Sequence, residues 1–461
     1  MDEDWAKKLL TIVIGSIVLF TILICQTQEI EKNLMENGTK QETAEQKETE
    51  WETQGGQGEE STQKGSGQTE EATDGQPVFV YGQEENPILR VLIKNANYAG
   101  EYHERLRIYG DQGFSLTYDD VEEEYGAGEI LEIERGTYET VGKIRIEPKE
   151  GGRICILDLQ RNQEEPMYRG SLEITRYPEG MRVINVVHME DYLCGVVPSE
   201  MPASYPIEAL KAQAVCARSY AHKSKEYSQG MYDLDDSTSY QVYNNFPEND
   251  NTTNAVEQTR GEVMLQDGEV VDARYYSTSC GVKLGQDLSQ EPAFEAFLSQ
   301  NSDTAYEKEE PWYRWKAEVS LEQLRKAVLE QWNTDVGQIC GVYVSEREKN
   351  GCAKKLVITG SFQELVIEGE YNIRMVLSPK FFPVVNQIDS GAVGMSLLPS
   401  GFFYLEPKKE EEVLCGYTIY GGGYGHGIGM SQNGAKQMAL NDMDYREILS
   451  YFYGDIEITS W

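Results

Sequence analysis

Residues 26–77 cannot contribute to a folded core. This acidic segment consists mainly of Glu, Gln, Thr and Gly and has almost no large apolar side chains. Burial of apolar surface cannot offset its loss of conformational entropy, so we expect a disordered linker. A flexible chain of this length has a root-mean-square reach of roughly 40 Å. The folded part must therefore come from the residues that follow, with the linker as a tether.

A short apolar run precedes the linker. Residues 9–25 are uncharged and follow Lys7 and Lys8. The length of the run suits a short membrane helix, and Ile22–Ile24 lack the small residues of a signal-peptide cleavage site. We expect an uncleaved single-pass anchor in the cell membrane. The two lysines would keep residues 1–8 in the cytoplasm and place the rest of the chain outside.

The charge of the chain argues against one class of partner. There are 41 Lys and Arg residues against 78 Asp and Glu residues, a formal net charge of −37. Such a surface repels phosphate backbones, so we expect no nucleic-acid partner. A neutral or locally cationic polymer remains compatible with it.

After residue 77 the sequence becomes globular. Ile88–Ile93, Ile130–Ile133 and Arg182–Val187 predict buried strands. We expect a β-rich N-terminal part over residues 78–180 and a mixed α/β catalytic part over residues 181–461. The fold class would be α+β.

Three helices are predicted in the catalytic part. Pro206 and Glu208 suit the first turn of the clearest one. One face of this helix is mostly alanine, so another element must pack closely against it. That face comprises Leu210, Ala214, Ala217 and Ala221. The other two helices are expected to start near Ser431 and to run from Tyr445 to Tyr453.

The cysteines do not indicate a metal or redox motif. Seven of the eight follow residue 25, and none forms a C-x-x-C pair. Their odd number and apolar surroundings favour buried free thiols, although Cys340 and Cys352 could form a disulfide across a hairpin.

Glu200 is the first candidate catalytic residue. It lies between Pro198 and Pro202, and these prolines stiffen the backbone that carries it. Apolar neighbours such as Val197 would raise its pKa by desolvation, as a general acid requires. A glutamate in a proline-rich turn is also commonly a solvated turn residue or a helix cap, so the local pattern leaves both roles open.

Several motifs together resemble one protein family. S-E-M-P and E-A-L-K-A-Q-A-V-x-A-R-S-Y lie within Asp191–Ala221, and GYGHGIGMSQNGA spans Gly423–Ala435. Gln241–Tyr243 and Tyr276–Gly281 lie between them. In this order, from about residue 88 to the C-terminus, the motifs resemble the stage II sporulation protein D family, which also includes amidase enhancers.

The resemblance implies a peptidoglycan lytic transglycosylase without a cofactor, with Glu200 as acid and base. Glu200 would protonate the oxygen between N-acetylmuramic acid and N-acetylglucosamine and then deprotonate the 6-hydroxyl that closes on C1. The 1,6-anhydro product would come from peptide-free strands, as in remodelling of the sporulation septum, beside an amidase partner at the membrane. The alternative is a non-catalytic, wall-binding enhancer of an N-acetylmuramoyl-L-alanine amidase, and a third possibility is a purely structural anchor.

Lys211 and Arg218 match family positions on the predicted helix. Seven residues apart, they share a face to within about 20° at ~100° per residue. They would bind sugar hydroxyls or acylamino carbonyls, or else be solvated charges paired with Glu208 or Glu226.

Further substrate-binding candidates come from the two later motifs. They are Tyr276, Ser277, Ser279, His426 and Gln432. His426, among glycines, could donate to the substrate or stabilise a turn. Gln432, at an expected helix start, could equally be structural.

Aromatic and thiol groups leave further alternatives open. Tyr243, Tyr276 and Tyr424 could stack on sugar faces, although tyrosines more often pack in the core. Cys280 with His426 would suggest a thiol peptidase, but buried cysteine is the commoner fate.

No metal site is expected. Some relatives in this family bind zinc through a Cys and a His-Cys pair just before the Q-V-Y segment. Residues 234–240 contain neither residue type, and the four histidines are far apart in the sequence.

Overall fold

The computed structural model describes residues 86–460, apart from 135–141, 163, 229, 301–304, 389 and 393–394. The expected anchor and linker lie outside these residues. Within the described part, no helix combines the length and apolar character required to span a membrane. Residues 86–94 and 102–460 belong to one compact unit. Residues 95–101, with the 3-10 helix η1 (Ala96–Tyr98), belong to another.

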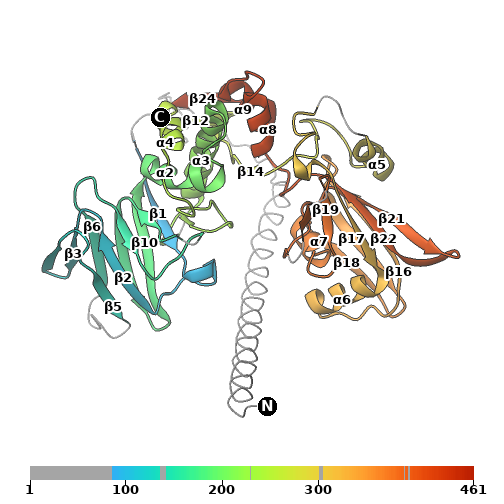
Figure 1. Ribbon diagram of the computed structural model, residues 1–461, viewed down its shortest axis with the longest axis horizontal. Coiled ribbons are helices and arrows are strands. Elements are labelled where there is room, and N and C mark those ends of the chain that lie inside the picture. The colour runs from blue at the N-terminus through green and yellow to red at the C-terminus, as the bar shows by residue number, and fades with distance from the viewer. Residues whose placement is uncertain are drawn as a thin grey trace, which may run out of the picture. The chain divides into compact units, whose positions relative to one another are not determined.

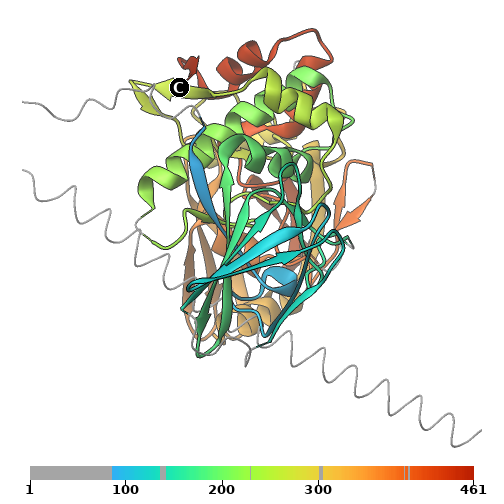
Figure 2. The same cartoon turned by 90° about the vertical axis from the view of Figure 1, so that its left-hand side faces the viewer.

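Two β-sheets are built mainly from residues 88–188. Their strands are β1 (Ile88–Ile93), β2 (Arg105–Gly110), β3 (Phe114–Tyr118), β4 (Val121–Tyr125), β5 (Leu131–Glu134), β6 (Lys143–Pro148), β7 (Ile154–Ile156), β8 (Met167–Tyr168), β9 (Ser171–Tyr177), β10 (Gly180–His188) and β11 (Leu234–Asp235). The larger sheet has the order β11-β1-β10-β9-β6-β3-β4 and the smaller the order β5-β2-β7-β8. Alternating burial, as in β5, directs one face of each sheet into a shared core (Figures 1 and 2).

A layer of helices completes this core. The helices are α2 (Met189–Glu200), α3 (Ile207–Tyr227), α4 (Asp250–Gln258), α8 (Gln432–Ala439) and α9 (Tyr445–Tyr453). The central helix α3 contacts the other four, and also contacts a small sheet of β12 (Glu262–Gln266), β13 (Glu269–Val270) and β24 (Glu457–Ser460). The predicted alanine face of α3 is fully buried, and its small side chains allow this close packing.

Residues 315–421 build a second hydrophobic core. Its elements are β15 (Trp315–Ser320), α6 (Leu321–Trp332), β16 (Ile339–Arg347), β17 (Ala353–Gly360), β18 (Glu364–Glu368), α7 (Glu370–Val376), β19 (Val384–Asn386), β20 (Gly391–Ala392), β21 (Phe403–Glu410) and β22 (Val413–Gly421). The strands form sheets in the orders β20-β19-β15-β22-β21 and β16-β17-β18. The remaining elements are β14 (Tyr275–Tyr276), α5 (Glu291–Ser299), η2 (Pro311–Tyr313) and β23 (Met430–Ser431).

The mixed α+β class with a β-rich part agrees with the sequence prediction. The three predicted strands are present, as are the helices that begin after Pro206, at Gln432 and at Tyr445. All seven cysteines among the described residues are free, and five are buried. One local prediction was wrong: Glu200 is the last residue of α2 rather than part of a turn, because the helix continues through Pro198.

Candidate functional site

Glu200 ends a helix whose start is fixed by the larger sheet. β10 leads directly into α2, which buries most of its length and ends at Glu200. Glu200 as a whole residue is intermediate between buried and exposed. Its Oε1 accepts the Val242 N–H at 2.6 Å, and its backbone oxygen accepts Nε2 of Gln432 at 2.9 Å. Both main chain and side chain of Glu200 are therefore held in place.

Burial raises the pKa of Glu200 from 4.5 to about 7. Hydrogen bonds from the Val242 N–H and the Tyr275 hydroxyl oppose this shift by favouring the carboxylate. Among the described residues, no second carboxylate contributes to the pKa of Glu200. Near neutral pH the group is divided between acid and carboxylate, so it can give a proton and take one back.

A glycine brings the segment with Val242 against α2. A Cβ atom at Gly195 would lie 2.4 Å from Oδ1 of Asn244 and 2.6 Å from the ring of Tyr243. The Asn244 N–H donates to the Gly195 oxygen at 3.2 Å. Only glycine permits this close approach, which places the Val242 N–H at the Glu200 carboxylate.

Tyr275 and Gln241 form a polar support beneath Glu200. Nε2 of Gln241 donates to the Tyr275 hydroxyl at 3.1 Å, and Oε1 of Gln241 accepts the Tyr192 hydroxyl at 3.2 Å. Because Tyr275 accepts from Gln241, its own proton is directed to Glu200. The residue that donates to Glu200 is Tyr275, not the neighbouring Tyr276 that the motif predicted. The Q-V-Y segment, which contains the partner of Tyr275, was the available signal.

The two later motifs are joined side by side. β14 and β23 pair in parallel, with Tyr275 opposite Met430. Thr278 and Tyr424 exchange two backbone hydrogen bonds, at 2.8 and 3.1 Å. Gln432, directly after β23, contacts Glu200, so these segments and α2 form one site. Since Nε2 of Gln432 is occupied by the Glu200 oxygen, Gln432 positions the main chain of Glu200.

His426 stabilises a turn at the edge of this site. Its Nδ1 accepts the Ile428 N–H at 3.1 Å, and its ring lies 5.6 Å from that of Tyr276. Burial and the nearby Arg274 lower the pKa of His426 to about 4, so the ring is neutral at pH 7. The neutral ring carries its proton on Nε2, so His426 stabilises the turn through Nδ1 and donation to a substrate stays a prediction.

The three substrate-binding candidates within Tyr276–Cys280 differ in how far their side chains are exposed. Tyr276 and Ser277 are partly exposed, so contact with a substrate remains a prediction for both. Ser279 is buried and its Oγ accepts the Gly281 N–H at 2.9 Å. The prediction that Ser279 binds substrate is corrected, because its side chain is enclosed and engaged in the turn.

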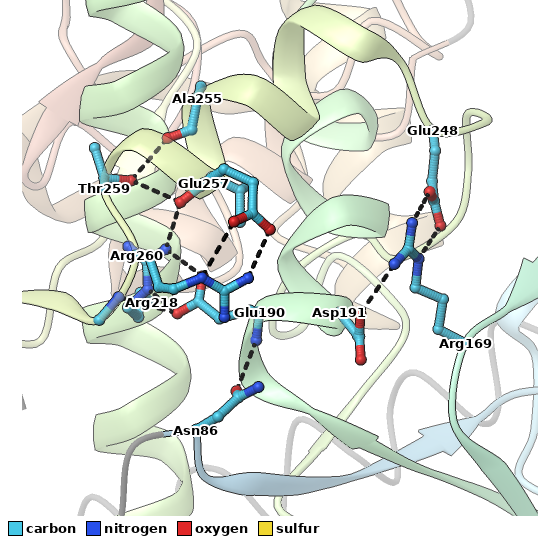
Figure 3. Close-up of polar contacts among 12 residues, drawn as sticks. Asn86, Arg169, Glu190, Asp191, Arg218, Glu248, Ala255, Glu257, Thr259 and Arg260 are labelled. Atoms are coloured by element: carbon cyan, nitrogen blue, oxygen red, sulfur yellow. Dashed lines mark hydrogen bonds and ion pairs between the residues drawn. The ribbon is translucent and has the colours of Figure 1, made fainter. Parts of the chain in front are cut away.

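Arg218 does not reach a substrate either. Its side chain is completely buried, and its guanidinium forms two hydrogen bonds to Glu190, of 2.8 and 2.7 Å (Figure 3). It also donates to the backbone oxygens of Val256 and Glu262. The substrate-contact prediction for Arg218 is therefore wrong: the residue ties α3 to α2, α4 and β12.

Lys211 lies on the wrong face of α3. It pairs with Glu208 at 2.8 Å, and its Nζ lies 5.5 Å from the centre of the Tyr445 ring on α9. Gln213, whose Oε1 lies 3.4 Å from Nε2 of Gln432, is two residues away and thus about 200° around the helix. Lys211 is not brought to Glu200.

The aromatic and thiol alternatives are also resolved in part. Tyr243 is buried and its hydroxyl donates to Oδ1 of Asn185 at 2.9 Å, so it packs in the core. Tyr424 is partly exposed, with its ring 5.4 Å from that of Trp312. Burial raises the pKa of Cys280 to about 12, so the thiol form is favoured at neutral pH and Cys280 is a poor candidate for a nucleophile.

Residues 234–240, where the family resemblance raised the question of zinc, make other contacts. Oδ1 of Asp235 accepts the N–H and Oγ of Ser237. Asp236 forms a buried 2.8 Å ion pair with Arg161. A guanidinium here disfavours a second cation by charge repulsion.

We expect the purified protein to contain no stoichiometric zinc and to be unaffected by a chelator. The physical reason is the Arg161–Asp236 pair together with the lack of Cys and His over residues 234–240. Elemental analysis of protein purified without chelator checks this. One zinc per chain would contradict it.

Comparisons with known proteins agree with the motifs. A family described as "Stage II sporulation protein" matches residues 177–265, and a domain of unknown function matches residues 268–429. An uncharacterized protein of Brachyspira hyodysenteriae is 32% identical over 64% of this chain and 73% of its own length. The amidase enhancer of Bacillus subtilis is 30% identical over 58% of this chain, but the match spans only 40% of the enhancer. Stage II sporulation protein D of Bacillus subtilis is 26% identical over 64% of this chain and 81% of its own length. The chain belongs to the stage II sporulation protein D family.

Proposed function

We propose that this protein is a peptidoglycan lytic transglycosylase in which Glu200 is both acid and base. The observation that carries the proposal is a partly exposed Glu200 with a pKa of about 7. A carboxyl group with this pKa is ready to donate a proton at neutral pH and is a useful base after donation.

The proposed reaction needs one protein carboxyl group. Protonated Glu200 gives its proton to the glycosidic oxygen as the bond from C1 of the muramic acid residue breaks. The resulting carboxylate then takes the proton of the 6-hydroxyl, whose oxygen bonds to C1. Atoms and protons balance, with no water consumed, and Glu200 returns to its acid form. Glycosidases that use water need a second carboxylate, whereas closure by the 6-hydroxyl of the same sugar does not.

The neighbours of Glu200 suit this alternation. The Val242 N–H and the Tyr275 hydroxyl donate to the carboxylate and so stabilise the charged intermediate form. Burial acts in the opposite direction and favours the acid form. The balance of these two effects keeps both forms accessible at one pH.

The direct test is digestion of peptide-free glycan strands followed by mass spectrometry. We expect fragments with 1,6-anhydro ends, which are lighter by one water molecule than hydrolysed ends. Hydrolysed ends alone would point to a different reaction. Strands that still carry stem peptides are the comparison substrate, and we expect them to be cut more slowly, as for septal wall remodelling after an amidase has acted.

A second candidate function is stimulation of an amidase. It is favoured by the similarity to a protein named amidase enhancer. The two functions separate in one experiment, in which an N-acetylmuramoyl-L-alanine amidase is assayed with and without this protein. Faster peptide release with no anhydro ends would establish the enhancer role in place of the enzyme.

We also propose that residues 9–25 anchor the protein in the cell membrane. We expect the protein to fractionate with membranes, and external protease to release a fragment that starts between residues 26 and 80, since that linker lacks a core. N-terminal sequencing of the released fragment checks this. A soluble mature form cleaved near residue 25 would contradict it.

A further inference from the structure

Glu307 is a buried carboxyl group beside the first turn of α8, and the proposed reaction does not use it. It lies in the segment before η2 and is only 5% exposed. Its Oε1 has no hydrogen-bond partner among the described residues. An unpaired buried carboxyl oxygen destabilises a fold, so stability alone does not account for this side chain.

Ser431, at the start of α8, links Glu307 to the site. Oγ of Ser431 accepts the N–H groups of Ser279 and Gly434, each at 3.1 Å. Both lone pairs are therefore occupied, and the hydroxyl proton must be donated. Its acceptors are the Glu307 carboxylate and the Ser277 oxygen, which is 3.4 Å away. A charge-assisted hydrogen bond is the stronger of the two, so the Ser431 hydroxyl donates its hydrogen bond to ionised Glu307.

The close contact between Glu307 and α8 depends on a glycine. A Cβ atom at position 434 would lie 2.6 Å from Oε1 of Glu307 and 2.8 Å from the ring of Phe452. With glycine there, the first turn of α8 approaches the carboxyl group directly. The positive end of the helix dipole then favours the ionised form of Glu307.

The next residue carries this contact to Glu200. Gln432 donates to the Glu200 backbone oxygen at 2.9 Å, and the Glu200 carboxylate accepts the Val242 N–H. We propose that Glu307 is a positioning residue for Glu200. Glu307 accepts a hydrogen bond from the Ser431 hydroxyl and so fixes the first turn of α8. Gln432 in that turn then fixes the main chain that carries Glu200.

The protonation of Glu307 would control this link. The titratable and charged groups around it are Tyr276, Cys280, Tyr313, Tyr451, Glu310 and Lys436. Burial raises the pKa of the Cys280 thiol and of the three tyrosines, so these groups stay neutral near pH 7. Glu310 is paired with Lys436 at 2.8 Å. Burial raises the pKa of Glu307 itself to about 7, so Glu307 loses its charge as the pH falls through neutrality.

The test is amide hydrogen exchange in the full chain at pH 8, where Glu307 is ionised. The Gly434 N–H reports the Ser431 contact, and the Ser279 N–H reports both Ser431 and the Glu307 carboxylate. The Val242 N–H reports the Glu200 carboxylate. We expect Glu307→Gln to speed exchange at all three by about fivefold, the difference between a charge-assisted and a neutral hydrogen bond. Glu309→Gln, an exposed glutamate two residues away, is the matched control and should change none.

The pattern of exchange decides the outcome. Faster exchange at Ser279 and Gly434 with an unchanged Val242 would mean that Glu307 supports α8 alone, and the inference would be wrong. No change at any reporter would also overturn it. Gly434→Ala keeps the Glu307 carboxyl group but pushes α8 away from it, so this variant should show the same exchange pattern as Glu307→Gln. It replaces Glu307→Gln in the test if Glu307→Gln is poorly folded.

Turnover gives a second measurement, which rests on the proposed function. At pH 8, Glu307→Gln should lower kcat on peptide-free glycan about fivefold with KM unchanged. Protonation of Glu307 would add a fall in rate on the acid side of pH 7 in the wild type, and this fall should be absent in the variant. Unchanged kcat and pH dependence would contradict the positioning role. If the wild type does not cleave glycan, the proposed function fails, while the exchange result still decides whether Glu307 positions Glu200.

Discussion

Glu200→Gln is expected to lower turnover of peptide-free glycan by about 10² to 10⁴, because proton transfer contributes that much and one group performs both transfers. The amide has nearly the shape of the acid and can still accept the Val242 N–H, so the fold and glycan binding should persist. Release of anhydro-ended fragments measures turnover. Thermal unfolding checks that the fold persists, and a glycan-binding assay checks that binding persists. Near-normal release of these fragments by the variant would show that the mechanism is wrong.

The pH dependence gives an independent check on Glu200. The acid form starts the reaction, so the rate should fall as the pH rises through the Glu200 pKa of about 7. An ordinary glutamate would give that fall near its usual pKa of about 4.3. Glu200→Asp should also be slow, since the shorter side chain misplaces the proton by about 1 Å. Glu309→Gln, on an exposed side chain, is the control and should keep the wild-type profile.

Arg218→Ala is expected to destabilise the protein by about 3–5 kcal/mol, because it leaves the buried Glu190 carboxylate without its partner. Denaturant unfolding monitored on the whole chain measures the change. The matched control is Arg260→Ala, which breaks an exposed 2.6 Å pair with Glu257 in the same region (Figure 3) and should cost only about 0–1 kcal/mol.

A double variant separates the ion pair from its surroundings. Replacing Arg218 by Met and Glu190 by Leu removes both buried charges, so stability should recover in part relative to Arg218→Ala. A stability loss for Arg218→Ala no larger than for Arg260→Ala would contradict the structural role. If Arg218 instead contacted glycan, its loss would raise KM in protein that is still fully folded.

Elements with a clear periodic pattern could be predicted from the sequence. The alternating or continuous apolar segments gave β1, β5 and β10, and the alanine face gave α3. The helix α2 was missed because Pro198 was interpreted as part of a turn. Burial of Val196 and Val197 holds the helical conformation through that proline, and such tertiary support is not visible in local sequence.

Site residues were predictable only where a motif carried them. Glu200 lies in such a motif, whereas Tyr275 and Glu307 act on the site through partners far away in the sequence. Arg218, in contrast, was predicted to bind substrate but has a structural role. Helical spacing correctly placed it on one face with Lys211, but spacing does not tell which element covers that face. Here α2, α4 and β12 cover it and convert a candidate binding residue into a buried ion pair.

The order in which the site residues occur along the chain has a consequence for timing. Glu200, Val242 and Tyr275 are made long before Gln432, which holds the Glu200 main chain from the first turn of α8. Chains fold from the N-terminus as they emerge, so the large sheet and α2 can form while the site still lacks this support. A wall-cutting activity at Glu200 would therefore begin only after α8 has been made. A product truncated before α8 would contain Glu200 but lack the Gln432 contact to its main chain.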